Sequence, residues 1–191
     1  MSFLLMPPPR PFAARRSFLG QSGAVLSGAA VALLASRPAL AAQAGDAAGT
    51  DAQVLNAALA SELEAIAAYQ LGADSKLLRK PALDLALAFQ GHHKAHAALL
   101  ASTVETLGGK PVDAKPAYDF PAHQLKTEAD VLGFAAKLEQ GAVSAYLGAV
   151  PRFGNRDLAR AAASILGDEA MHWAVLRQAL GQDPVPAAFV G

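Results

Sequence analysis

The positions of the prolines constrain the fold of this chain more than any other sequence feature. Between residues 39 and 191, Pro occurs only at 81, 111, 116, 121, 151, 184 and 186. The stretches between these positions are long and rich in Ala, which favours helix, and in the first of them apolar residues recur every three or four positions. The sequence therefore predicts an all-α chain whose four helices lie at about 51–73, 81–107, 127–150 and 156–180.

The lengths of the connections indicate how these helices are arranged. The first and last pairs have short links, so each pair should form an antiparallel hairpin. The middle link, residues 108–126, contains three Pro and two Gly and cannot be helical. Nineteen extended residues reach up to ~60 Å, whereas a twenty-residue helix is ~30 Å long. The link can therefore run the length of the bundle and start the third helix parallel to the second.

Local signals support the predicted helix ends. Pro81 suits the first turn of a helix, where its missing N–H costs nothing. Thr127 followed by Asp130 resembles a capping signal at the start of the third helix. Gly108 and Gly181 follow the second and fourth helices, where Gly commonly ends a helix.

Composition excludes several classes of function. Sixteen basic and sixteen acidic residues give no net charge, which argues against a nucleic-acid partner. The absence of Cys excludes disulfides, thiolate zinc sites, iron–sulfur clusters and cysteine nucleophiles. Any chemistry must therefore come from His and carboxylate side chains.

The first 41 residues resemble a twin-arginine export signal. Arg15 and Arg16 precede Phe18 and Leu19, a modestly apolar core follows at 20–36, and Ala39-Leu40-Ala41 has the form of a cleavage site. The core is short for a membrane span; an ordinary secretory signal or an uncleaved anchor is the alternative. The resemblance implies a periplasmic or otherwise exported protein that uses the twin-arginine machinery, which carries folded proteins. We expect residues 42–50 to be a linker and 182–191 an extended tail.

A repeated pattern of Glu and His marks the candidate site. Glu169 and His172 form a Glu-x-x-His, whose side chains share one helix face. His93 and His96 stand 76 positions earlier in the same spacing. The other two helices carry Glu62 and Glu139, 77 positions apart, and each of these is followed seven residues later by a Tyr, Tyr69 or Tyr146.

The register of the hairpins predicts that these residues meet. In an antiparallel hairpin, residues equidistant from the turn lie at the same depth. Glu62 and His93 are equidistant from the first predicted turn, and Glu139 and Glu169 from Gly154 in the second. We therefore expect one layer across the bundle to contain six side chains: Glu62, His93, His96, Glu139, Glu169 and His172.

This pattern resembles that of the ferritin-like superfamily. Its dimetal-carboxylate proteins use one Glu from each of two helices and a Glu-x-x-His from each of the other two. The stretches LASELEAIAAYQ and GDEAMHWAVLRQALG look like ferritin-like domain proteins found behind bacterial export signals. The resemblance, distant from rubrerythrin and ferritin themselves, implies a ferritin-like four-helix bundle over residues 51–181. It also implies that Glu62, His96, Glu139, Glu169 and His172 bind one or two ions of Fe or Mn.

The sequence departs from that pattern at His93, where the family has the Glu that bridges two metals. A neutral imidazole has one lone pair and cannot bridge as a carboxylate does, so an asymmetric pair of ions or a single ion becomes an alternative. Pairing Gln90 with His93 is a second arrangement, which we rank below His93 with His96. We expect His93 and His96 to be ligands, and His92 to lie outside the ligand set or beside it. Asp168 is either a hydrogen-bond partner of a ligand His or an exposed cap.

These observations support two hypotheses of function. The first is an exported metal-binding protein with redox activity on iron or peroxide. Unlike rubrerythrins, the chain has no Cys for a rubredoxin-type iron site, so electrons would come from an external donor, unless the reaction were a peroxide disproportionation. The second is a non-catalytic scaffold, such as a stress- or desiccation-related envelope protein.

Tyr69 and Tyr146 either hydrogen-bond ligand carboxylates or only fill the core. Association into a homo-oligomer is compatible with either hypothesis.

Overall fold

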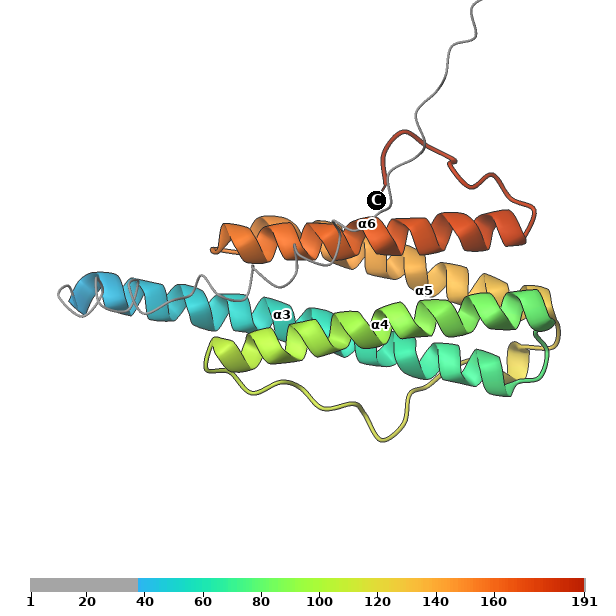
Figure 1. The fold of residues 1–191 in the computed structure, drawn as a ribbon, viewed down its shortest axis with the longest axis horizontal. Coiled ribbons are helices and arrows are strands. Elements are labelled where there is room, and N and C mark those ends of the chain that lie inside the picture. The colour runs from blue at the N-terminus through green and yellow to red at the C-terminus, as the bar shows by residue number, and fades with distance from the viewer. Residues whose placement is uncertain (1–37, 191) are drawn as a thin grey trace, which may run out of the picture. The chain divides into compact units, whose positions relative to one another are not determined.

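The computed structural model describes residues 38–190, which contain four α-helices and no β-strand. The helices are α3 (Pro38–Asp74), α4 (Lys80–Thr106), α5 (Glu128–Ala149) and α6 (Arg156–Ala179), shown in Figure 1. Two short 3-10 turns, η1 (Ala122–Gln124) and η2 (Val150–Arg152), lie in the connections. The prediction of an all-α four-helix bundle is confirmed. The predicted signal peptide lies outside the described residues, except for its last four residues, which begin α3.

The predicted signals end the helices as expected. Thr127 and Asp130 form a complete capping box at the start of α5. Gly108 and Gly181 follow α4 and α6 with φ values of 78° and 71°. In both places the next residue's N–H bonds to a carbonyl five positions back, the pattern of a Schellman motif. Because Gly adopts positive φ without steric cost, each helix stops at its glycine.

The start of α3 differs from the prediction. Residues 42–50, expected to be a linker, are helical, because α3 begins at Pro38. The stretch is rich in Ala, the strongest helix former, and after Pro38 no proline occurs before Pro81. The small residues that suggested a linker therefore extend the helix. None of the helices within residues 38–190 is both long and apolar enough for a membrane span.

The connection between α4 and α5 runs along the bundle, as its length predicted (Figure 1). Arg79, just before α4, donates its backbone N–H and its guanidinium to Glu128, the first residue of α5, at 2.6–3.0 Å. These contacts place the two helix starts together, so α4 and α5 are parallel. Near the other end, Asn56 of α3 bonds to the backbone of Lys110 and Val112 at 2.9 Å and fixes the start of the crossover.

Two apolar clusters fill the space between the helices, and they contain different parts of each helix. The first includes Leu55, Leu59, Leu100 and Ile165, and the second includes Phe89, Leu132, Leu176 and further residues of all four helices. Between them, in sequence position along every helix, lie the buried Glu and His residues. The core is thus an apolar bundle interrupted by one polar layer.

Asp51 of α3 holds the connection that precedes α6, and replacing this residue should lower the stability of the fold. Its buried carboxylate accepts the backbone N–H groups of Gly154 at 2.8 Å and Asn155 at 3.0 Å. We expect Asp51→Ala to destabilise the protein by about 2–3 kcal/mol, since both donors lose a charged acceptor. Thermal unfolding should show a melting temperature lower by roughly 5–10 °C. Asp46→Ala, which removes an exposed carboxylate from the same helix, is the control; equal effects of the two variants would refute this role.

Candidate metal centre

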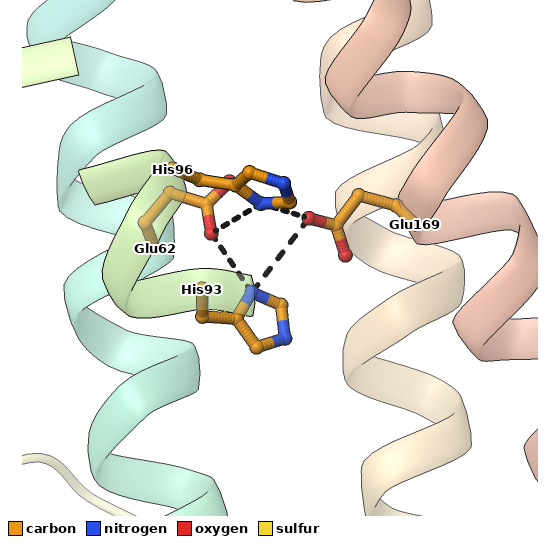
Figure 2. A group of neighbouring side chains, drawn as sticks. All are labelled: Glu62, His93, His96 and Glu169. Carbon is orange, nitrogen blue, oxygen red and sulfur yellow. Dashed lines mark hydrogen bonds and ion pairs between the residues drawn. The ribbon is translucent and has the colours of Figure 1, made fainter. Parts of the chain in front are cut away.

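The six side chains predicted to meet do lie together in the structure. Five of them are at most 2% exposed, and His96 has a side-chain exposure of 14%. Figure 2 shows four of these residues, with Glu62, His93 and His96 facing Glu169 across the interior. The predicted layer of six side chains is thus present in the structure, whereas the metal-ligand roles of these residues remain a prediction.

The six residues form two overlapping groups, each of which offers four donor atoms within 4.8 Å of one another. The α3–α4 hairpin supplies three members of the first group, Glu62, His93 and His96, and Glu169 completes it from the other hairpin. The α5–α6 hairpin supplies three members of the second group, and His93 completes it. Each hairpin therefore borrows one side chain from the other. The members of the second group are His93, Glu139, Glu169 and His172.

His93 belongs to both groups, and its two ring nitrogens face different carboxylates. Its Nδ1 is 2.8 Å from Glu62 Oε2, and its Nε2 is 3.2 Å from Glu139 Oε1. His93 thus contacts the carboxylates of both Glu62 and Glu139, although a neutral imidazole has only one nitrogen lone pair to give to a metal. When protonated, it donates a hydrogen bond to each of them.

Two tyrosines hold the same two carboxylates in a reciprocal arrangement. Tyr69 of α3 donates its hydroxyl to Glu139 of α5, and Tyr146 of α5 donates to Glu62 of α3 at 2.5 Å. Both rings are also buried in the apolar clusters, so each tyrosine combines the two roles that the sequence left open. Burial and the adjacent carboxylates raise the pKa of both phenols, which therefore stay protonated as donors.

The charges of the layer support one another. Burial alone would lower the pKa of His93, but Glu139 and Glu62 raise it to about 10. Burial is likewise outweighed at His96 and His172, whose neighbouring carboxylates raise each pKa to about 9. Burial would raise the pKa of Glu62 and Glu139, and the imidazoles lower both below the usual value. Without metal, the imidazoles are therefore protonated at neutral pH.

Several buried atoms of the layer nevertheless lack a hydrogen bond. Both oxygens of Glu169 are among them, together with Glu139 Oε2 and the Nδ1 atoms of His96 and His172. Glu169 has imidazole nitrogens at 3.1–3.6 Å, within ion-pair range but outside hydrogen-bond geometry. Unsatisfied buried polar atoms are uncommon and call for an explanation such as an ion. Carboxylate oxygens and imidazole nitrogens are ligands that divalent metals accept, so the residues fit a metal.

Asp168 and His92 lie on the outer side of the layer. Asp168 Oδ2 is 3.3 Å from Nε2 of both His96 and His172, and 3.1 Å from His92 Nδ1. Asp168 is therefore a partner of the predicted ligand imidazoles rather than an exposed cap. Gln90 does not join either group, because it donates to Ile66 O at 3.0 Å; the alternative pairing with His93 is not the one adopted.

Sequence reasoning missed the third group of potential ligands, which His92 and Asp168 form with His172. The signal was present in the spacing. His92 precedes His96 by four residues, Asp168 precedes His172 by four, and residues four apart share a helix face. Only the packing of α4 against α6 brings the two pairs together, and the sequence did not specify it.

We expect the stability of chelator-treated protein to depend on pH in two ranges. Because their pKa is raised, the three imidazoles stabilise the fold below pH 6.5, and this contribution is lost as the pH rises toward 9–10. Because their pKa is lowered, Glu62 and Glu139 stabilise it above pH 4.5, and this contribution is lost in acid. Melting temperatures should therefore peak between about pH 5 and 6.5.

The alkaline side of this profile has a matched control. His96→Gln should flatten part of the fall between pH 6.5 and 9, whereas His123→Gln, at an exposed position in the crossover, should leave it unchanged. A melting temperature of the unsubstituted protein that is constant from pH 6.5 to 9 would show that the imidazoles are not stabilised by their carboxylates.

Comparison with known proteins supports the same architecture. No curated protein matches the chain. A conserved hypothetical protein, rv2844, from Mycobacterium tuberculosis is similar in structure, with a TM-score of 0.65, 23% identity, and coverage of 75% of this chain and 99% of that one. A ferritin-like, diiron-carboxylate protein from Bacillus anthracis str. Ames has a TM-score of 0.61, 21% identity, and coverage of 70% and 97%. A family model for the ferritin-like domain matches residues 50–182. The chain therefore belongs to the ferritin-like domain family.

Proposed function

We propose that this chain is an exported metalloprotein that binds one or two ions of iron or manganese and carries out redox chemistry on iron or peroxide. The observation that carries the proposal is the set of unsatisfied buried atoms around Glu169. Burying a carboxylate without a full set of partners is costly, and a divalent ion would use the free lone pairs. The B. anthracis protein of similar fold is described as a diiron-carboxylate protein.

The residues of the layer have distinct roles in this proposal. Glu169 belongs to both groups, so it would be the carboxylate that two ions share. Tyr69 and Tyr146 would keep Glu139 and Glu62 oriented by donating to one oxygen of each. The apolar clusters would limit access of water. Bound iron or manganese would supply the one-electron chemistry that the side chains themselves lack.

His93 suggests that two ions would be bound with unequal affinity. Its ring can give a lone pair to one group only, while its other nitrogen keeps a proton for the nearby carboxylate. The group that receives the lone pair has four protein ligands, and the other has three. One ion would therefore be held more tightly than the second.

The same residue favours a second candidate function, that of a non-catalytic scaffold in the envelope. Protonated His93 satisfies one oxygen each of Glu62 and Glu139 without any ion, and three imidazoliums balance three carboxylates. This arrangement leaves both oxygens of Glu169 without a hydrogen bond, which is why we place metal binding first. Metal content separates the two functions.

Export rests on the N-terminal sequence alone. The pair Arg15 and Arg16, the apolar stretch at 20–36 and the small residues at 39–41 occur in the order of a twin-arginine signal. We propose that the protein crosses the membrane folded and acts in the periplasm or beyond it. Folded export would allow the ions to be loaded before the chain leaves the cytoplasm.

Metal binding should depend on Glu169. Adding Mn²⁺, or Fe²⁺ in the absence of oxygen, should raise the melting temperature of the unsubstituted protein. At a free ion concentration of a hundred times Kd, the free energy of unfolding should increase by about 2.7 kcal/mol. Glu169→Gln keeps the shape of the side chain but weakens its ligation, so the response should be largely lost. Glu105→Gln changes an exposed carboxylate on α4 and should respond fully. Elemental analysis of native protein should find one or two equivalents.

The outcome also decides between the two functions. Metal-loaded protein should oxidise Fe²⁺ with dissolved oxygen as the electron acceptor, or disproportionate hydrogen peroxide to oxygen and water, and the Glu169→Gln variant should do neither. Absence of bound metal, together with equal melting temperatures with and without ions, would overturn the metal proposal and leave the scaffold. Bound metal without either activity would limit the proposal to metal binding.

Export should require the arginine pair. We expect the double substitution Arg15→Lys, Arg16→Lys to retain the protein in the cytoplasm, since it keeps the charge but removes the paired guanidinium groups. Arg10→Lys, which lies outside the pair, is the control. Cell fractionation with an antibody against the mature domain measures the distribution. Unchanged export of the double variant would exclude the twin-arginine route.

A further inference from the structure

A third group of potential ligands lies at the outer side of the buried layer and shares only His172 with it. It consists of His92 Nδ1, Asp168 Oδ2 and His172 Nε2. The two imidazole nitrogens are 2.8 Å apart, and the carboxylate oxygen is 3.1 Å from His92 and 3.3 Å from His172. Three potential donor atoms from two helices thus lie within 3.3 Å of one another, and a hydrogen bond joins the two imidazole nitrogens.

These separations match those around a single divalent ion. Ligand atoms ~2.0–2.1 Å from an ion are about 2.9 Å apart at right angles and about 3.3 Å apart in a tetrahedral site. The three separations, 2.8, 3.1 and 3.3 Å, span this range. An ion could bind these three atoms without a large movement once the proton of that hydrogen bond is released to solvent, and water could complete its coordination.

The group connects solvent with the buried centre. The side-chain exposure of His92 is 51%, that of Asp168 is 24%, and that of His172 is 2%. Next to them, Glu169 has no exposure at all. The potential ligands thus form a continuous series from an open surface to the centre of the bundle.

His172 belongs to both the outer group and the inner layer. Its Nε2 faces His92 and Asp168, while its Nδ1 is 3.4 Å from Glu169 Oε2. Phe89 stacks on the His172 ring at a centroid distance of 4.0 Å. This contact keeps the ring oriented with one nitrogen toward the outer group and the other toward the inner layer. A neutral imidazole has a lone pair on only one nitrogen. The ring can therefore bind an ion on its outer or its inner side, with the proton on the opposite nitrogen.

We propose that His92, Asp168 and the outer nitrogen of His172 form a second metal site, which takes up a divalent first-row transition ion from solvent and delivers it to the buried layer. The ligand set of two imidazoles and one carboxylate suits Fe²⁺, Co²⁺ or Zn²⁺ better than Mg²⁺ or Ca²⁺. Outer binding stands on its own geometry, whereas delivery inward rests on the proposed function.

A different role for the same residues makes a different prediction. If His92 and Asp168 only position His172 by hydrogen bonding, then removing either one should weaken inner binding at equilibrium. Such partners typically change metal affinity by about 10–100-fold. An uptake site should instead control how fast the inner centre fills and should hold an equivalent of its own.

Co²⁺ is a suitable probe because its visible absorption reports coordination, and it can be followed by equilibrium titration and by rapid mixing. The variants are His92→Ala and Asp168→Asn, with His123→Ala as the control at an exposed histidine of the crossover. Melting temperatures in chelator should verify that each variant is folded. We expect an ion to bind at the outer group before the inner layer fills. Once His172 serves the inner layer, His92 and Asp168 should retain one further equivalent, held only weakly.

His92→Ala should lose the weak equivalent, keep the inner stoichiometry and fill the inner centre about tenfold more slowly, and His123→Ala should match the unsubstituted protein. Asp168→Asn should also lose the weak equivalent. An unchanged number of equivalents and an unchanged filling rate in His92→Ala would overturn the proposal, as would loss of inner affinity with no separate weak equivalent. Absence of inner ions in every protein would refute the proposed function, and a weak equivalent that depends on His92 would then still support the outer site.

Discussion

The structure depends on satisfying three carboxylates in the middle of an apolar bundle. An isolated buried charge is costly, and removing one partner of a buried pair usually costs several kcal/mol. Apart from His172, which shares α6 with Glu169, the partners of the three carboxylates come from other helices. They are imidazoles from α4 and α6, and phenols from α3 and α5. A shift of α5 along α3 would break both tyrosine–glutamate bonds at once. The polar layer thus fixes the register that the small, Ala-rich faces specify only weakly.

His93 changes how the layer is neutralised. A carboxylate at this position would leave four negative charges and two imidazoles, and such a site needs cations to be stable. With His93 the layer holds three carboxylates and three imidazoles, whose raised pKa values allow protons to balance the charge. Protons and metal ions therefore compete for the same nitrogen lone pairs, and binding an ion at neutral pH must release protons.

Much of the fold could be predicted because its signals are local. The prolines, Gly108, Gly181 and the Thr127 capping box define helix ends within one or two residues. The start of α3 could not be predicted, because a run of Ala with scattered Gly is compatible with both a linker and a helix. The six residues of the layer were found because hairpin symmetry converts sequence spacing into depth.

What could not be predicted is the contact between side chains of different helices. The direction of each ring nitrogen of His93, the crosswise pairing of Tyr69 with Glu139, and the meeting of His92 with Asp168 all depend on how the hairpins rotate against each other. Sequence spacing fixes height along the bundle but leaves this rotation open.

Because each group of four potential ligands takes one side chain from the opposite hairpin, a complete metal site can form only after the two hairpins have docked. Each hairpin is a local structure that can form early, but neither contains a complete four-donor group, because Glu169 and His93 come from opposite hairpins. Closing the crossover brings the halves together at a modest entropic cost. An ion that requires both halves would favour the docked state by mass action. Ion retention would therefore distinguish a finished bundle from two undocked hairpins.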